Sequence, residues 1–99
     1  MKIVVVTACT AGIARAYLAA AHLEKVARSL GHEIRVETQG AMGIENGLTE
    51  RDIREAEITI LANDIEIEGR ERFNGMKIIQ ISLQDAIRNP EGIFRKIQG

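Results

Sequence analysis

Near its amino terminus the chain reads Thr7-Ala8-Cys9-Thr10-Ala11-Gly12-Ile13-Ala14-Arg15. The residues at positions 3–6 are all apolar and β-branched, which predicts a buried strand before this stretch. An alanine-rich segment from about position 13 to position 30 follows it and predicts a helix. The quoted stretch is therefore expected to be a strand-to-helix turn, and it contains the only cysteine of the chain.

This turn combines a nucleophile with groups that bind anions. Backbone N–H groups in the first turn of a helix have no partner within the helix and carry partial positive charge, so they attract phosphate. The same field favours the thiolate form of a cysteine placed there, and Gly12 permits a tight curve of the backbone. Cys9 and Arg15 also match a Cys-x5-Arg pattern, in which a guanidinium binds the oxygens of a phosphoryl group held on sulfur. We therefore interpret Cys9 as a candidate phosphoryl acceptor.

A structural role is the alternative interpretation of Cys9. A lone cysteine is most often a small buried apolar side chain, and Cys-x5-Arg occurs by chance in many chains. The position at the start of a helix is what supports the nucleophile. His22 and His32 have no carboxylate or cysteine beside them in the sequence, which favours structural roles for both.

The composition excludes several classes of protein. A length of 99 residues suits one compact domain covering residues 1–99, and 45% hydrophobic with 27% charged residues is ordinary for a globular protein. A net charge of −1 predicts no attraction to nucleic acid or to anionic membranes. The chain has a single cysteine, no signal-peptide pattern and no apolar run of about 20 residues. These features predict a cytoplasmic protein.

The pattern of elements predicts an α/β fold: a three-layer, Rossmann-like arrangement with a four-stranded parallel sheet and helices on both faces. After the first strand, strands are expected at 33–38, 57–62 and 76–82. Residues 33–38 alternate apolar and charged side chains, so this strand is placed at a sheet edge with Glu37 on its solvated face. Right-handed crossovers then give the order 2-1-3-4, and Cys9 falls in the crevice at the carboxyl ends of the strands.

Other segments are expected to be loops or short helices. Residues 39–48 contain three glycines and an asparagine, which indicates a loop, and Thr49 is a predicted N-cap of a short helix that ends near Ala56. Residues 70–72 are interpreted as a solvated turn with an aromatic side chain packed beneath it, and Asn89-Pro90 begins a final helix. Asp64 follows the third strand on the same rim as Cys9, where loop capping is favoured over a role as an acid or an orienting group.

With these residues in place, the chain resembles the fructose-specific enzyme IIB component of the bacterial sugar phosphotransferase system over roughly residues 2–97. The most distinctive shared segments are Val6-Thr7-Ala8-Cys9 with Gly12-Ile13-Ala14, Val36-Glu37-Thr38-Gln39-Gly40 and Gly43-Ile44-Glu45-Asn46. Shorter agreements lie at residues 23–25, 48–49, 52–53, 64–65, 71–73 and 89–91.

The resemblance implies a phosphocarrier. The family's cysteine accepts a phosphoryl group from a phosphohistidine of a IIA component and passes it to a sugar delivered by the membrane component IIC, and Cys9 stands at that position. No metal or cofactor is expected, because the backbone amides of the loop would neutralise the charge of the phosphoryl group. The phosphate would be bound by Thr10, Ala11, Gly12, Ile13, Ala14 and Arg15.

The chain departs from the family within this loop, which usually reads cysteine-proline-threonine-glycine-isoleucine-alanine-histidine-threonine. Thr10, Ala11, Arg15 and Ala16 replace the proline, the first threonine, the histidine and the last threonine. Ala11 and Ala16 lack hydroxyl groups that could bind phosphate, and Arg15 substitutes a permanent cation for a titratable imidazole.

Three functions stay open at this level. The first is a phosphocarrier for fructose or a related hexose, which the resemblance favours. The second is a small cysteine phosphatase of the Cys-x5-Arg type, for which Asp64 is the one candidate acid. The third is a regulatory relative that binds an anion or a IIA component without transferring phosphate.

Overall fold

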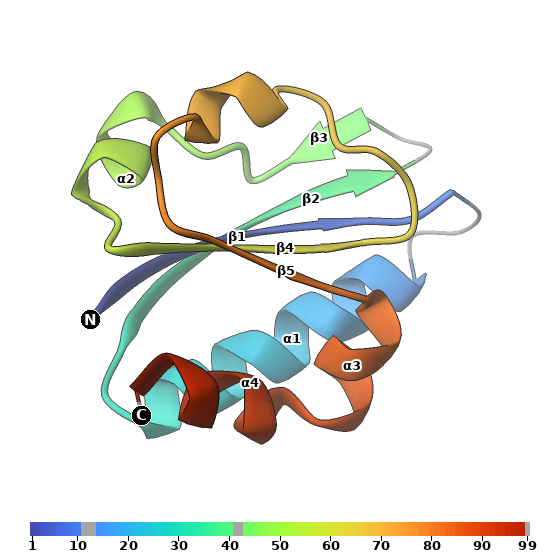
Figure 1. Cartoon of the computed structure of the whole chain (residues 1–99). Coiled ribbons are helices and arrows are strands. Elements are labelled where there is room, and N and C mark those ends of the chain that lie inside the picture. Colours follow the sequence, from blue (N-terminus) through green and yellow to red (C-terminus); the bar gives the residue numbers. More distant parts are fainter. Residues whose placement is uncertain (11–13, 41–42, 99) are drawn as a thin grey trace.

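A computed structural model describes residues 1–10, 14–40 and 43–98, and within them the chain forms a twisted sheet with helices on both sides (Figure 1). The strands are β1 (Lys2–Ala8), β2 (Glu33–Gly40), β3 (Gly43–Glu45), β4 (Ile58–Asn63) and β5 (Ile78–Ile81). The helices are α1 (Ala14–Ser29), α2 (Glu50–Glu55), α3 (Leu83–Arg88) and α4 (Pro90–Gln98), with a 3-10 turn η1 (Arg70–Phe73).

The sheet order is β3-β2-β1-β4-β5. The strands β2, β1, β4 and β5 are parallel, so the predicted class and the predicted relative order of the four parallel strands are confirmed. The sheet has one strand more than the four predicted, because β3 pairs antiparallel with the end of β2. Part of the predicted 39–48 loop is strand, because Gln39 and Gly40 belong to β2 and Gly43–Glu45 form β3. Gly43 begins β3 with a φ of 95°, a backbone conformation that favours glycine.

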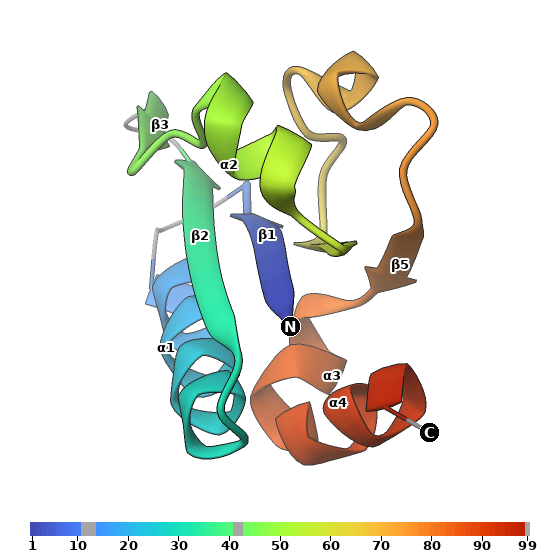
Figure 2. The ribbon, with the colours of Figure 1, turned by 90° about the vertical axis from the view of Figure 1, so that its left-hand side faces the viewer.

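The expected three layers are present (Figures 1 and 2). On one face of the sheet, α1, α3 and α4 cover a core that includes Val5, Leu23 and Phe94. On the other face, α2 and η1 lie over a smaller core around Val6 and Phe73. Both faces of β1 are therefore buried, which explains why its sequence is continuously apolar rather than alternating.

The helix α3 was not predicted from the sequence. It has only six residues and begins directly after β5, where the Ser82 hydroxyl accepts a hydrogen bond from the Asp85 N–H at 3.0 Å. A helix of this length shows too little apolar periodicity to be distinguished from a loop. The last helix begins at Pro90, as predicted.

The predicted cap of α2 is confirmed. The Thr49 hydroxyl accepts a hydrogen bond from the Asp52 N–H at 3.0 Å, and the Asp52 carboxylate accepts one from the Thr49 N–H at 3.0 Å. This reciprocal pair satisfies two N–H groups at the start of a helix of only six residues.

We predict that Thr49→Ala lowers the free energy of unfolding by about 1 kcal/mol, because an uncapped helix start loses one hydrogen bond to the backbone. The Thr49→Ser variant keeps the hydroxyl and should unfold close to the wild-type midpoint. Urea unfolding followed by circular dichroism measures both. Equal midpoints for the alanine and serine variants would contradict a role of the cap in stability.

Candidate functional site

Cys9 directly follows β1 at the carboxyl end of the parallel strands, which is the location expected from the strand order. Its backbone N–H donates a hydrogen bond to the carbonyl of Gln39 at 3.2 Å, so the pairing of β1 with β2 continues to Cys9. The residue is 4% exposed and packs in the core between the sheet and α1. Cys9 is therefore a buried residue at the carboxyl end of the sheet.

The structure places part of the predicted phosphate-binding turn. Thr10 follows Cys9 and is exposed, while Ala14 and Arg15 are exposed residues of the first turn of α1. Ala11, Gly12 and Ile13 lie outside the described residues. The described residues thus supply the two sides of the turn, the end of β1 and the start of α1.

Arg15 and Asp64 meet at this rim. Arg15 Nη1 donates to Asp64 Oδ2 at 2.6 Å, and the two side chains are 51% and 32% exposed. The Asp64 N–H donates to the carbonyl of Ala8 at 3.0 Å, which fixes the Asp64 backbone beside the residue that precedes Cys9. The structure therefore pairs Arg15 with Asp64, although they lie 49 positions apart in the chain, and places the Asp64 backbone beside the residue before Cys9.

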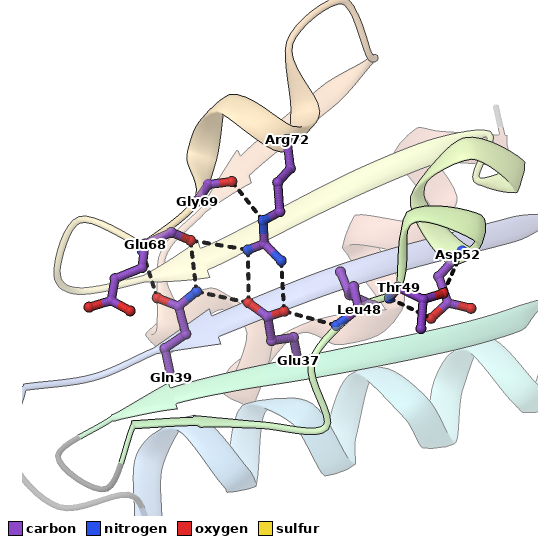
Figure 3. A network of polar contacts seen from close by, with 8 residues as sticks. All are labelled: Glu37, Gln39, Leu48, Thr49, Asp52, Glu68, Gly69 and Arg72. Carbon is purple, nitrogen blue, oxygen red and sulfur yellow. Dashed lines mark hydrogen bonds and ion pairs between the residues drawn. The ribbon is translucent and has the colours of Figure 1, made fainter.

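On the other side of Cys9, the sheet carries a buried carboxylate. Glu37 was predicted to be solvated, but it is 1% exposed. Figure 3 shows the polar groups that surround its carboxylate. Its Oε1 accepts hydrogen bonds from Arg72 Nη1 and from the Leu48 N–H, each at 2.9 Å. Its Oε2 accepts from Arg72 Nη2 at 2.9 Å and from Gln39 Nε2 at 2.8 Å. The prediction of a solvated face failed here because the segments before α2 and around η1 fold over this face of β2. The predicted edge position holds for residues 33–37, since β3 pairs only with the last three residues of β2.

Gln39 links this carboxylate to the backbone of Cys9. Its side-chain Nε2 also donates to the carbonyl of Glu68 at 3.0 Å, and its Oε1 accepts from the Glu68 N–H at 2.8 Å. Its own backbone carbonyl accepts the Cys9 N–H. The Glu37 network, which we define as Glu37, Gln39, Leu48, Glu68 and Arg72, thus fixes the part of β2 that holds Cys9 in place.

Arg72 was predicted to belong to a solvated turn, and this prediction was wrong. Its guanidinium binds Glu37 through both terminal nitrogens, donates from Nε to the Gly69 carbonyl at 2.8 Å and lies 5.0 Å from the centre of the Phe73 ring. The expected burial of Phe73 beneath the turn is confirmed. Gly69 has a φ of 73°, and a Cβ there would lie 2.5 Å from Arg72 Nε, so only glycine fits against this guanidinium.

The charges of this network stabilise one another. Burial would raise the pKa of Glu37, but hydrogen bonds from Arg72, Gln39 and the Leu48 N–H outweigh it and hold the pKa below its ordinary value. The hydrogen bond with Glu37 raises the pKa of Arg72 in turn. The sequence carries one signal for this network: residues 37 and 39 are two positions apart on a strand, so their polar side chains share one face.

Other features of the described residues lie away from this rim. A groove of about 680 Å³ runs between α1 and α4, lined by residues that include Leu18, His22 and Pro90, and none of its lining residues is a predicted site residue. Among the described residues, no group of three histidine, cysteine or acidic side chains could hold a metal ion. No described helix has the length and apolar character needed to cross a bilayer.

Comparison with known proteins identifies the family. Residues 4–96 match the family described as "PTS system, Lactose/Cellobiose specific IIB subunit". The chain belongs to the PTS IIB family. The family predicted from the sequence is thus confirmed, and this IIB chain shares the family's general role as a phosphotransferase component in sugar transport.

Individual relatives support the same assignment. The "PTS system fructose-like EIIB component 2" of Escherichia coli (strain K12) is 44% identical over 97 residues, which cover 98% of this IIB chain and 92% of the relative. The "Fructose-like PTS system EIIBC component" of the same strain is 44% identical over 99 residues, covering 98% of this IIB chain and 20% of that longer protein. The solution structure of the Enzyme IIB subunit of the PTS system from Escherichia coli K12 superposes with a TM-score of 0.93 at 43% identity, covering 98% and 90% of the two chains.

We predict that Glu37→Gln lowers the free energy of unfolding by about 3 kcal/mol at neutral pH. This is the lower end of the range for a broken buried ion pair, because the Arg72 side chain is 27% exposed and can be partly rehydrated. Glu33→Gln, an exposed glutamate on the same strand, is the matched control and should change stability by less than about 0.5 kcal/mol. Urea unfolding of the three proteins measures the difference.

The difference in unfolding free energy between wild type and Glu37→Gln should depend on pH. Because the folded pKa of Glu37 is lowered, its stabilisation is complete above the unfolded pKa of about 4.3 and is lost as the pH falls through the lower folded value. The stability gap between wild type and Glu37→Gln should therefore narrow below about pH 4. If the difference in unfolding free energy between wild type and Glu37→Gln stays the same down to pH 2 to 3, the charge of Glu37 is not the cause of the stabilisation.

Proposed function

We propose that this chain is the IIB phosphocarrier of a sugar phosphotransferase system, with Cys9 as the phosphoryl acceptor. The observation that carries the proposal is the position of the chain's only cysteine, directly before the β1–α1 turn, in a member of the PTS IIB family. Fructose or a related hexose is the proposed sugar, because the curated relatives are named fructose-like. The family description names lactose and cellobiose instead, so the sugar is assigned from the relatives.

The proposed reaction transfers one phosphoryl group in two steps. The Cys9 sulfur, having lost its proton, attacks phosphorus on a phosphohistidine of a IIA component. The P–N bond breaks with its electron pair returning to the imidazole, which takes up a proton, and a P–S bond forms. In the second step a sugar hydroxyl attacks the same phosphorus, loses its proton and releases the thiolate of Cys9.

The chain would stabilise the phosphoryl group without a metal. Backbone N–H groups of residues 10–14 are the proposed donors to its oxygens, and Arg15 is the proposed cation beside them. The roles of Ala11, Gly12 and Ile13 in this proposal rest on the sequence. Because helices cover both faces of the sheet, partners would reach Cys9 along the carboxyl rim.

The proposed partners are a IIA phosphodonor and a IIC transporter, with the sugar bound by IIC. The relative named EIIBC, in which the matching segment is 20% of the chain, supports an association with IIC. We propose that residues 1–99 act as one EIIB-like domain in the cytoplasm, and that contacts with IIA and IIC are small and transient, because each partner must separate after transfer.

A cysteine phosphatase is the second candidate, and the Cys-x5-Arg spacing is the observation that favours it. A phosphatase needs an acid to protonate its leaving group. Asp64 is the candidate acid, and its carboxylate is engaged with Arg15 at 2.6 Å. Membership of the PTS IIB family favours the phosphocarrier over the phosphatase.

We predict that Cys9→Ser abolishes phosphoryl acceptance, because a serine hydroxyl is not ionised at neutral pH and is a far weaker nucleophile than a thiolate. Intact mass spectrometry after incubation with a phosphorylated fructose-type IIA protein should show one added phosphoryl group on wild type only. Unchanged acceptance by the serine variant would place the acceptor elsewhere. No acceptance by wild type, with the fold intact, would indicate the regulatory alternative.

We predict that phosphocysteine survives longer in wild type than in Arg15→His when no sugar is present. A permanent guanidinium can donate two charge-assisted hydrogen bonds to the phosphoryl dianion, and such bonds contribute about 1.5–3 kcal/mol each in favourable geometry. The half-life of the phosphorylated protein, followed by mass spectrometry, measures the effect. A longer half-life in the histidine variant, together with hydrolysis of p-nitrophenyl phosphate by wild type, would favour the phosphatase.

A further inference from the structure

Asp64 has a position that the proposed phosphocarrier chemistry does not yet use. Its backbone N–H donates to the carbonyl of Ala8, and strand pairing places Asn63 opposite Ala8. Asp64 therefore directly follows the neighbouring strand β4, as Cys9 directly follows β1. Neighbouring strands are about 4.8 Å apart. The Asp64 carboxylate binds the Arg15 guanidinium at 2.6 Å, so the guanidinium is anchored to a residue whose backbone lies beside the end of β1.

The geometry points to Asp64 as a competing counter-ion that regulates the phosphorylated state of Cys9. This inference rests on the proposed function and adds a residue to it. In the unphosphorylated protein Arg15 binds Asp64, and when Cys9 receives a phosphoryl group the guanidinium exchanges from the carboxylate to the phosphoryl oxygens. Asp64 is thus a positioning residue, acting on the phosphoryl group only through Arg15.

Breaking the Arg15–Asp64 contact costs little free energy, because both side chains are partly exposed to solvent. Arg15 and Asp64 are 51% and 32% exposed, and ion pairs that solvent reaches contribute little to stability. A phosphoryl dianion carries more charge than one carboxylate and accepts a guanidinium through two parallel hydrogen bonds. The dianion therefore wins the competition, but part of its interaction with Arg15 is offset by the loss of the Arg15–Asp64 contact.

This offset matters for a carrier, because its phosphoryl group must be accepted from one protein and given to another. A permanent cation at position 15 stabilises the phosphorylated state, and stabilisation of a ground state alone slows the next transfer. A carboxylate that competes for the cation reduces that stabilisation. Asp64 would thus keep the phosphoryl group on Cys9 transferable.

The quantity that tests the inference is the equilibrium constant for phosphoryl exchange between a fructose-type IIA protein and this chain, measured by intact mass spectrometry of both proteins. Asp64→Asn should raise the phosphorylated fraction of this chain, increasing the constant by up to about fivefold, the factor that an exposed ion pair can contribute. Asp64→Glu, which keeps the carboxylate, should lie nearer to wild type than Asp64→Asn. Glu66→Gln removes a charge from an exposed residue of the same loop and should change the constant less.

Two further readouts separate this role from a purely structural one. In an Arg15→Gln background, Asp64→Asn should leave the constant unchanged, because no guanidinium remains to compete for. The difference between wild type and Asp64→Asn should also shrink between about 0.1 M and about 1 M salt, where screening shortens the range of charge interactions. Urea unfolding midpoints show whether each variant keeps the fold.

The outcomes are distinct. If wild type accepts no phosphoryl group from IIA, the proposed function fails and the inference falls with it. If wild type accepts it but Asp64→Asn leaves the constant unchanged or lowers it, the phosphocarrier proposal stands and the competing counter-ion is overturned. A persistent effect of Asp64→Asn in the Arg15→Gln background would also overturn it, since Asp64 would then act without Arg15.

Discussion

The buried ion pair between Glu37 and Arg72 is the constraint on which the layer above β2 depends. A carboxylate removed from water is stable only when nearly all of its hydrogen-bonding capacity is satisfied. Four donors from three segments supply this, and two of those segments have little regular structure. The segments before α2 and around η1 are thus held on the sheet by one carboxylate as well as by the small core around Phe73.

The parts of the fold that were predictable are those that local patterns determine. The apolar run of β1 and the alanine-rich α1 have clear periodicities, and the parallel order of the strands follows from the handedness of their connections. Glu37 could not be predicted in the same way. Alternation indicates which face of a strand a residue occupies, but not which distant segment covers that face, and Arg72 is 35 residues away.

The same reason explains what was predicted of the candidate site and what was not. The location of Cys9 follows from the strand order, because parallel strands bring their carboxyl ends to one rim. That Asp64 lies on this rim was predictable from its place after a strand, but its contact with Arg15 depends on side-chain reach. The strand β3 was missed because it has three residues, one of them a glycine, and is formed by its pairing with β2 rather than by its own propensity.

The lengths of the outer strands have a consequence for association. At the two edges of the sheet lie β3, with three residues, and β5, with four. Short edges offer few unpaired N–H and carbonyl groups on which another chain could add a strand. On the β2 side, β3 pairs only with Thr38, Gln39 and Gly40, and the remaining outer edge of β2 carries the exposed charges of Glu33 and Arg35. Short edges and edge charges both disfavour the addition of a strand from a neighbouring molecule.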